Sequence, residues 1–192
     1  MHDNEDRHYI ERVLDGEPDA YAFLVEKYKT MAYNISLKIV KRQEDAEEIT
    51  QDSFFRAYKS LRSFKGDAKF STWLYRIVYN ASVSHTRKKK REMPVDEQSR
   101  DFLKHPDMVE DGEGETDESL SAALKKAVDS LPSPEQTMIN LYYYENSNIE
   151  DIARIMSLSA SNVKVKLFRI RKKLYDHIKS INQNSESASI KI

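Results

Sequence analysis

The residues of this sequence best suited to chemistry are six lysines and arginines between Lys164 and Lys173, a stretch that contains no acidic residue. Their chemistry is the binding of a polyanion, because ammonium and guanidinium groups pair with phosphates. The whole chain has 192 residues and a formal net charge of −1, so the basic stretch is a local feature. The element that presents these cations must therefore be identified first.

The basic stretch fits one face of an amphipathic helix. At about 100° per residue, an apolar stripe that no cation shares is formed by Val163, Leu167, Ile170, Leu174 and Ile178. Two apolar residues, Val165 and Phe168, lie among the cations on the other side. A helix in the DNA major groove uses such residues, since they contact thymine methyl groups while Arg169 or Asn162 reaches base edges. The alternative is a basic surface helix with two stray apolar residues.

A shorter helix and a tight turn are expected immediately before the basic helix. Asn148 is a suitable N-cap, supported by Asp151, and the apolar pattern ends at Met156. Ser157 stands where a helix-turn-helix often has Gly, which strains the backbone if its φ is positive. The third helix is expected from about Ser159. This arrangement predicts a helix-turn-helix.

Other helix starts are predicted from capping-box spacing, with Asp45 paired to Glu48 and Ser133 paired to Gln136. In the helix after Asp45, one face is expected to point inward through Ala46, Ile49, Phe55 and Tyr58. An earlier core-facing helix is indicated by apolar residues at three- and four-residue steps, namely Tyr21, Leu24, Val25, Tyr28, Met31, Ala32, Ile35 and Ile39.

Aromatic and basic residues alternate in the stretch "FKGDAKFSTWLYRIVYN", which is followed by the basic run Arg87–Arg91. Aromatic rings can stack on bases of single-stranded nucleic acid, at about 1 to 3 kcal/mol per base, while cations follow the phosphates. The alternative is that Phe64, Phe70 and Trp73 are core residues that join helices. Ser71 or Thr72 is a suitable cap for the helix that follows.

Composition excludes several classes of protein. With 39% hydrophobic and 33% charged residues and only four glycines, the chain is expected to be an all-α, soluble protein. It has no cysteine, no apolar run long enough for a membrane span, and an acidic N-terminus where a signal peptide would be basic. The histidines form no HExxH pattern and no Walker or G-x-S-x-G motif occurs, so we expect no enzyme, catalytic residue, metal or cofactor.

The chain is expected to consist of two helical domains. Between Glu92 and Glu118 there are eleven acidic and two basic residues, with prolines and glycines and no sustained apolar period, which indicates a disordered linker. The predicted organisation is a first domain over 1–91, an acidic flexible linker over 92–119, a helix-turn-helix domain over 120–180 and a polar tail over 181–192.

Four motifs occur in an order that resembles a bacterial RNA polymerase sigma factor of the extracytoplasmic-function group. They are "DAEEITQDSFFRAY", "FKGDAKFSTWLYRIVYN" with its basic run, "LPSPEQ" and "IEDIARIMSLSASNVKVKLFRIRKKL". The resemblance implies two helical domains, sigma region 2 and sigma region 4, joined by a flexible linker. It also implies that the chain binds core RNA polymerase, through the β′ clamp helices and the β flap, together with promoter DNA. A cytoplasmic location is implied, with an anti-sigma factor as an expected partner that could hold the chain at the membrane.

The resemblance also assigns residues to surfaces. The polymerase β′ clamp would be bound by a polar stripe, Glu48, Gln51, Asp52 and Arg56. The minus-ten element would be melted, and one of its bases would be flipped into a loop beside a helix. The residues of this loop and helix are Lys65, Gly66, Asp67, Ala68, Lys69, Trp73, Arg76 and Asn80. The minus-thirty-five duplex would be contacted by Asn162, Lys164, Val165, Lys166, Phe168, Arg169, Arg171 and Lys172.

Two other interpretations remain open from the sequence. A conventional helix-turn-helix regulator would bind duplex DNA tightly without polymerase. A pure interaction module would carry its basic runs only for solubility, and the polar stripe on the Glu48 helix would then be an ordinary solvated face.

Overall fold

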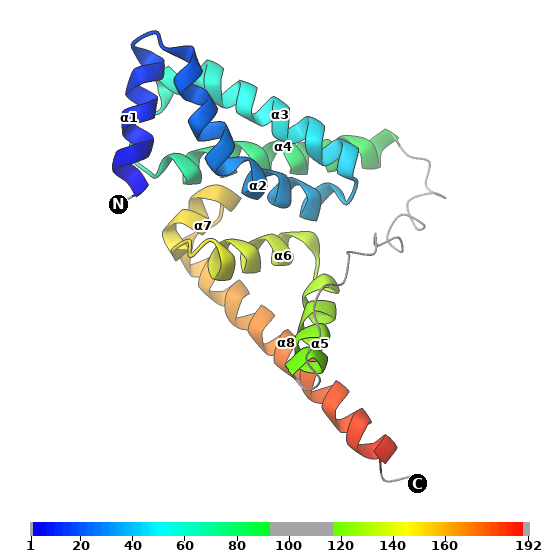
Figure 1. Cartoon of the computed structure of the whole chain (residues 1–192). Coiled ribbons are helices and arrows are strands. Elements are labelled where there is room, and N and C mark those ends of the chain that lie inside the picture. The colour runs from blue at the N-terminus through cyan, green and yellow to red at the C-terminus, as the bar shows by residue number, and fades with distance from the viewer. Residues whose placement is uncertain (1, 93–116, 190–192) are drawn as a thin grey trace.

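The computed structural model describes residues 2–92 and 117–189, and its described elements are all helices (Figure 1). The first half consists of α1 (His2–Leu14), α2 (Tyr21–Val40), α3 (Gln43–Ser60) and α4 (Phe70–Glu92). Two short 3₁₀ turns, η1 (Pro18–Ala20) and η2 (Leu61–Ser63), connect them. The helices α2, α3 and α4 pack against one another, with α1 beside α2. The expected all-α fold is confirmed for the described residues.

The second half contains α5 (Asp117–Asp129), α6 (Ser133–Ile139), α7 (Ile149–Met156) and α8 (Ala160–Ser189). Between α6 and α7 lies η4 (Asn140–Tyr144), a π-helical turn of a kind often found at functional sites. In Figure 1, α6 and α7 lie under the first bundle, while α8 runs away from it with α5 packed at its side. The start of the predicted tail at residue 181 thus falls within α8.

The apolar spacing of α2 produces the core of the first half. Seven of the eight predicted positions are buried, and Val25 is half-buried. Leu24 and Ile35 have no exposed surface, and burying such a side chain contributes about 1.5 to 3 kcal/mol. The helix ends at Lys41, whose φ of 64° is left-handed and whose amide bonds to the Leu37 carbonyl. The core-facing prediction for α2 is confirmed.

Two predicted capping boxes are wrong. Helix α3 begins at Gln43, so Asp45 lies in the first turn, where its carboxylate faces His85 Nε2 and Lys89 Nζ of α4 at 3.4 Å. Helix α6 begins at Ser133 without a side-chain cap, and Gln136 is buried instead. In both cases a contact with another segment replaces the local cap.

The inward face of α3 also differs from the prediction. Ala46 and Ile49 are buried as expected, but Phe54 is the buried aromatic residue and Phe55 is 57% exposed. Tyr58 is 39% exposed and packs edge-on against Tyr21. Adjacent phenylalanines lie about 100° apart on a helix, so packing against α2 and α4 decides which one is buried.

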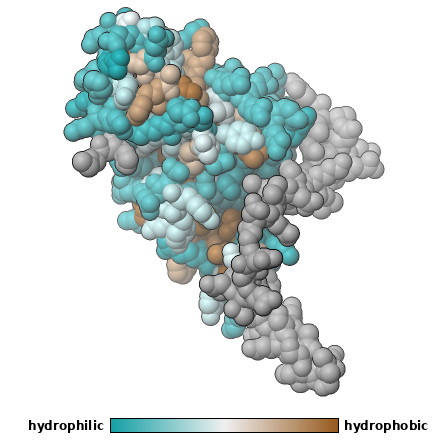
Figure 2. All heavy atoms as spheres, in the orientation of Figure 1, coloured by the Kyte–Doolittle hydropathy of each residue, from teal (hydrophilic) through white to brown (hydrophobic). Residues whose placement is uncertain are grey.

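The face of the molecule in Figure 2 is mostly hydrophilic, with hydrophobic residues gathered in small patches. None of the helices in the described part of the chain is both long and apolar enough to cross a membrane. Most of the predicted linker, 93–116, and the last three residues lie outside the described residues.

Candidate nucleic-acid interface

A helix-turn-helix is formed by α7 and α8. Asn148 caps α7, since its Oδ1 accepts a hydrogen bond from the Asp151 amide at 2.8 Å. Ser157 ends α7 with φ 55° and ψ 47°, the left-handed conformation expected for the turn. Ser159 then caps α8 by accepting a hydrogen bond from the Asn162 amide at 3.2 Å. The predicted cap at Asn148, the turn at Ser157 and the start of the third helix at about Ser159 are confirmed.

The buried and exposed faces of α8 are those predicted from the spacing of about 100° per residue. Val163, Leu167 and Ile170 are at most 2% exposed, and Leu174 and Ile178 are half-buried. On the outer face, Val165 is 46% exposed and Phe168 is 69% exposed. All eight residues of the candidate minus-thirty-five set are exposed: Asn162, Lys164, Val165, Lys166, Phe168, Arg169, Arg171 and Lys172. The helix therefore offers two apolar side chains inside a cationic surface.

The six cations of α8 between Lys164 and Lys173 fall into two groups. Arg171 donates to the Tyr143 hydroxyl, and Lys173 pairs with Glu135 at 2.9 Å. The other four have no hydrogen bond or ion pair within residues 2–92 and 117–189, namely Lys164, Lys166, Arg169 and Lys172. Four cations on one helix face are thus available for phosphates or bases.

One exposed aromatic residue on α8 was missed from the sequence. Tyr175 is 66% exposed and lies seven residues after Phe168, which places it two turns further along the same face. The i,i+7 spacing was the available signal. Tyr175 extends the apolar surface toward the C-terminal part of α8.

The candidate minus-ten residues surround the start of α4. Most of the loop from Lys65 to Lys69 is exposed, and Gly66 has a φ of 74°, a conformation that favours glycine. Arg76 and Asn80 are exposed on α4. This set of exposed residues around the start of α4 is the candidate minus-ten rim.

The aromatic residues of this stretch are largely structural. Phe70 is 2% exposed and Tyr75 is 3% exposed, so neither is available to stack on a base. Phe64 and Trp73 are half-buried, with ring centroids 5.9 and 5.8 Å from that of Phe70 and 5.3 Å from each other. Phe70 is therefore a core residue, as the alternative interpretation of this stretch predicted. Since α4 begins at Phe70, Ser71 and Thr72 lie in its first turn rather than capping it.

The polar stripe on α3 is exposed throughout, at Glu48, Gln51, Asp52 and Arg56. Phe55 lies next to this stripe, with Lys59 Nζ 4.2 Å from its ring centroid. An exposed phenylalanine is a typical component of a protein interface, where aromatic residues are enriched. Phe55 is therefore added to the candidate protein-binding surface. The sequence pattern placed Phe55 on the buried face, where the structure has Phe54 instead.

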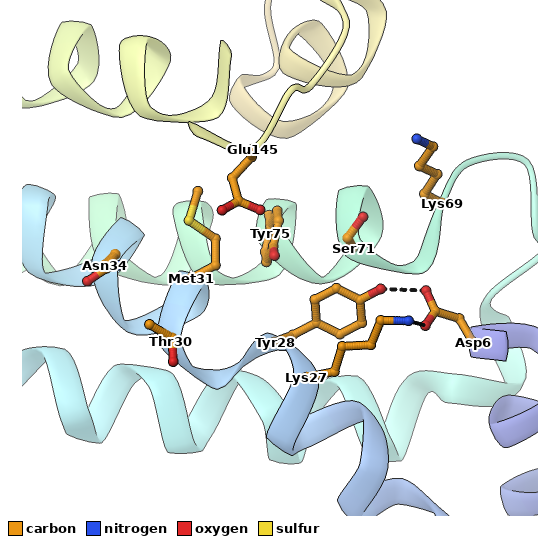
Figure 3. Close-up of a pocket in the computed structure, with 10 residues that line it drawn as sticks. All are labelled: Asp6, Lys27, Tyr28, Thr30, Met31, Asn34, Lys69, Ser71, Tyr75 and Glu145. Carbon is orange, nitrogen blue, oxygen red and sulfur yellow. Dashed lines mark hydrogen bonds and ion pairs between the residues drawn. The ribbon is translucent and has the colours of Figure 1, made fainter. Parts of the chain in front are cut away.

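A polar cavity of about 490 Å³ lies where α1, α2 and α4 meet Glu145 (Figure 3). The buried Asp6 carboxylate accepts hydrogen bonds from Lys27 Nζ at 2.6 Å and from the Tyr28 hydroxyl at 2.5 Å. Burial opposes the charge on Lys27, but hydrogen bonds and attraction from Asp6 and Glu5 outweigh it and raise its pKa. Partial burial raises the pKa of Glu145, and its interaction with Tyr75 partly offsets this effect. No sequence motif pointed to this network.

Within residues 2–92 and 117–189, no three His, Cys, Asp or Glu side chains are grouped so that they could hold a metal ion. The chemistry that the surfaces support is recognition, through cations, exposed apolar side chains and polar loops.

Comparison with protein families gives two matches. Residues 24–92 match the model of sigma-70 region 2, and residues 121–174 match that of sigma-70 region 4. The first match covers α2 to α4 and the second covers α5 to the basic part of α8. The two halves of the fold are therefore the two conserved regions of a sigma factor.

Three curated relatives resemble almost the whole chain. The sigma factor SigW of Bacillus subtilis is 30% identical over 90% of this chain and 96% of its own length. The sigma-E factor of Haemophilus influenzae is 30% identical over 92% and 96%. The sigma-H factor of Pseudomonas aeruginosa is 29% identical over 87% and 90%.

Two solved structures share the fold. The sigma factor RpoE of Bartonella quintana, in complex with the anti-sigma factor NepR, aligns with a TM-score of 0.63 at 20% identity, covering 83% of this chain and 96% of that one. CnrH, in complex with the cytosolic domain of CnrY, aligns with a TM-score of 0.63 at 20% identity, covering 91% and 97%.

The fold and the family matches define an RNA polymerase sigma factor with regions 2 and 4. The chain belongs to the extracytoplasmic-function sigma factors, which bind core RNA polymerase and direct it to promoters. Proteins of this family are generally not enzymes. The identification made from the four motifs is confirmed, and the interpretation as a conventional helix-turn-helix regulator is not favoured.

Proposed function

We propose that this sigma factor reads the minus-thirty-five element by placing α8 in the major groove. The observation that carries this proposal is the exposure of Val165 and Phe168 on the second helix of a helix-turn-helix, among four cations that pair with no group in the described part of the chain. Val165 and Phe168 would contact thymine methyl groups, and Arg169 and Asn162 would reach base edges. Phosphates would be bound by the remaining cations, Lys164, Lys166, Arg171 and Lys172.

The minus-ten element would be held at the rim around the start of α4. In this proposal the loop Lys65–Lys69 captures a flipped base, and Trp73, Arg76 and Asn80 contact the melted strand. Flipping costs a few kcal/mol of lost stacking, which contacts in the loop must offset. The exposure of the loop and of Arg76 and Asn80 supports this assignment. Burial of Phe70 and Tyr75 leaves Trp73 and Phe64 as the available rings.

Core polymerase would be bound by the α3 face, with Glu48, Gln51, Asp52 and Arg56 on the β′ clamp helices, and by the second half on the β flap. Full exposure of this stripe supports the first contact. Phe55 would supply the apolar centre that protein interfaces usually have. Polymerase performs the chemistry, and this chain supplies specificity.

We also propose the domain organisation expected from the sequence, with a region 2 domain over 1–91, a linker over 92–119, a region 4 domain over 120–180 and a tail over 181–192. An anti-sigma factor is proposed as a further partner, since RpoE and CnrH, the sigma factors in the two similar structures, are each bound to another protein. We place the chain in the cytoplasm, where such a partner could hold it at the membrane.

Run-off transcription with bacterial core polymerase on a promoter library tests the proposal. Transcripts that start from a shared two-element motif, and only when this chain is present, are the expected result. Tight duplex binding by the chain alone, with no polymerase-dependent transcript, would favour a conventional regulator instead.

Two variants on α8 separate base contacts from phosphate contacts. Lys172→Ala should make the log–log salt dependence of minus-thirty-five binding by the polymerase complex shallower by about 0.9, the value for one phosphate contact. Phe168→Ala should weaken binding while leaving that slope unchanged. Lys179→Ala, an exposed lysine further along α8, is the matched control and should change neither quantity. Equal effects of Lys172→Ala and Lys179→Ala would contradict the assignment of α8.

A further inference from the structure

Helix α1 lies outside the residues that match sigma-70 region 2 and belongs to none of the surfaces described above. The family match begins at residue 24, whereas α1 spans His2–Leu14. This helix packs against α2, and it also contacts η2, the turn that leads into the loop Lys65–Lys69. In Figure 1, the N-terminal end of α1 lies beside the start of α4. Helix α1 is therefore a neighbour of the candidate minus-ten surface.

The orientation of α1 is fixed by contacts with α2. The Asp6 carboxylate, 3% exposed, accepts hydrogen bonds from Lys27 Nζ at 2.6 Å and from the Tyr28 hydroxyl, as Figure 3 shows. The ring of Tyr9 stacks on that of Phe23, with centroids 3.8 Å apart. A buried ion pair and a stacked ring on the same helix leave it little freedom to rotate about its axis. The residue after Asp6 is therefore held facing a defined direction.

That residue, Arg7, lies against the backbone of the minus-ten loop. Its Nη2 is 3.8 Å from the position that a Cβ would take on Gly66. Gly66 has a φ of 74°, which favours glycine, and the missing side chain leaves the space beside the guanidinium open. Arg7 is exposed and makes no hydrogen bond or ion pair with another group in the described part of the chain. Its donors are thus available to a ligand at the loop.

The charges around the loop indicate what that ligand is. Lys65 and Lys69 are exposed on the loop itself, and Arg7 adds a third cation from a different helix, while Asp67 is the acidic residue of the loop. A nucleotide whose base enters the loop keeps its phosphate beside the loop backbone. A guanidinium suits this group, because its planar fork can bond two phosphate oxygens at once.

We propose that Arg7 binds a phosphate of the melted minus-ten strand, so that α1 is part of the promoter-binding surface. This inference rests on the proposed function of the loop Lys65–Lys69. Asp6 and Tyr9 are then positioning residues, since they hold α1 so that Arg7 faces the loop. The proposal gives a function to the buried Asp6 network, which no sequence motif indicated.

Binding of core polymerase carrying this chain to a promoter fork with an unpaired minus-ten element tests the proposal. Arg7→Ala should weaken binding about tenfold, the effect of losing a hydrogen bond from a charged donor. It should also make the log–log salt dependence shallower by about 0.7, the value for one phosphate contact on a single strand. Arg7→Lys keeps the charge without the fork and should restore the slope and part of the affinity.

Arg12→Ala is the matched control for these measurements. It removes the same type of side chain from the same helix, and Arg12 pairs with Glu17 at 2.6 Å instead of facing the loop. This variant should change neither the affinity nor the salt slope. Equal effects of Arg7→Ala and Arg12→Ala would reject the contact. Urea unfolding of Arg7→Ala should match the parent chain, and a large loss of stability would make the role of Arg7 structural and overturn the proposal.

Uncharged phosphate replacements show whether the contact is direct. Methylphosphonates are placed one at a time in the unpaired strand of the fork. One position should weaken binding of the parent chain and have no further effect on Arg7→Ala, because both changes remove the same contact. If every replacement weakens Arg7→Ala as much as the parent, then Arg7 does not touch the strand and the proposal is wrong.

Lys69→Ala distinguishes failure of this inference from failure of the proposed function. If the loop does not bind the minus-ten element, then neither Lys69→Ala nor Arg7→Ala should weaken binding to the fork. If the loop binds the element but Arg7 does not, then Lys69→Ala should weaken binding while Arg7→Ala leaves it unchanged. Weaker binding by both variants, with the salt slope and the methylphosphonate result described above, is the expected outcome.

Discussion

Arg171 of the basic helix donates a hydrogen bond from Nε to the Tyr143 hydroxyl at 2.9 Å, and its guanidinium lies 5.2 Å from the ring centroid of Tyr142. This hydrogen bond is the main cause of a raised pKa for Arg171. The π-helical turn Asn140–Tyr144 therefore holds one cation of α8 in a defined orientation, while its free donors can still reach a phosphate.

Replacing Tyr143 by phenylalanine should weaken binding of the polymerase complex to the minus-thirty-five duplex. The variant keeps the ring but loses the hydrogen bond that orients Arg171, a loss of about 0.5 to 1.5 kcal/mol or roughly two- to twelvefold in affinity. Thermal stability should change little, since Tyr143 is 51% exposed. Fluorescence anisotropy at constant salt measures the affinity.

A double-mutant cycle shows whether Tyr143 acts through Arg171. The effects of Tyr143→Phe and Arg171→Ala should not add, because both remove the same oriented cation. Tyr144→Phe, a variant of the exposed neighbouring tyrosine, is the control and should not affect binding. Additive effects would mean that Tyr143 contacts DNA by itself.

Substitutions of two neighbouring residues on α8, Phe168 and Leu167, should separate an effect on promoter binding from an effect on stability. Phe168→Ala should reduce promoter binding about tenfold or more, with little change in the free energy of unfolding, because the ring is 69% exposed. Leu167→Ala, at 2% exposed, should instead cost about 2 to 5 kcal/mol of stability. Urea unfolding and transcription assays on the same preparations measure both quantities. A large stability loss for Phe168→Ala would place the ring in the core.

Periodicity predicts an element well when its buried stripe is unambiguous. In α8 the sequence alone predicts the stripe from Val163 to Ile178 and the exposure of Phe168, because the cations leave only one face for the core. The turn at Ser157 follows from the cap at Asn148 and the end of the apolar pattern. The contacts of the exposed residues with DNA and polymerase stay predictions.

The features that the sequence predicted wrongly depend on contacts between segments far apart in the chain, because such contacts leave no local sequence pattern. Phe54 and Phe55 are equally apolar, and only the neighbouring helices select Phe54 for the core. Gln136 has capping-box spacing, yet it bonds to Lys41, 95 residues away. The contact of Arg154 with Asp67 joins residues 87 apart, so no window of sequence could indicate that the two halves pack together.

Phe55 should contribute to core polymerase binding. Phe55→Ala removes an exposed ring next to Gln51 and Asp52 and should lower the affinity for core polymerase about tenfold or more, as apolar anchors of interfaces do. Folding should be unaffected. Phe54→Ala, at 7% exposed, is the comparison and should cost about 3 to 5 kcal/mol of stability. Unchanged polymerase binding by a folded Phe55→Ala protein would restrict the interface to the polar stripe.

Stability should decline at alkaline pH because of buried tyrosines. Burial raises the pKa of Tyr21 and of Tyr75 well above the ordinary value near 10, and the charge of Glu145 adds to the effect at Tyr75. Above about pH 10 the unfolded chain releases these protons while the folded chain retains them, so the free energy of unfolding falls as pH rises.

Each of the two tyrosines can contribute up to about 1.4 kcal/mol per pH unit above that point. Tyr21→Phe should lower the free energy of unfolding by about 1 kcal/mol at neutral pH, since it removes the hydrogen bond to the Phe54 carbonyl at 2.9 Å. The same variant should lose stability less steeply as the pH rises above about 10. Urea unfolding from pH 7 to 11, with tyrosinate absorbance recorded on the folded protein, measures both effects. If the stability of Tyr21→Phe falls as steeply with pH as that of the parent chain, then Tyr21 is not one of the groups that cause the alkaline loss of stability.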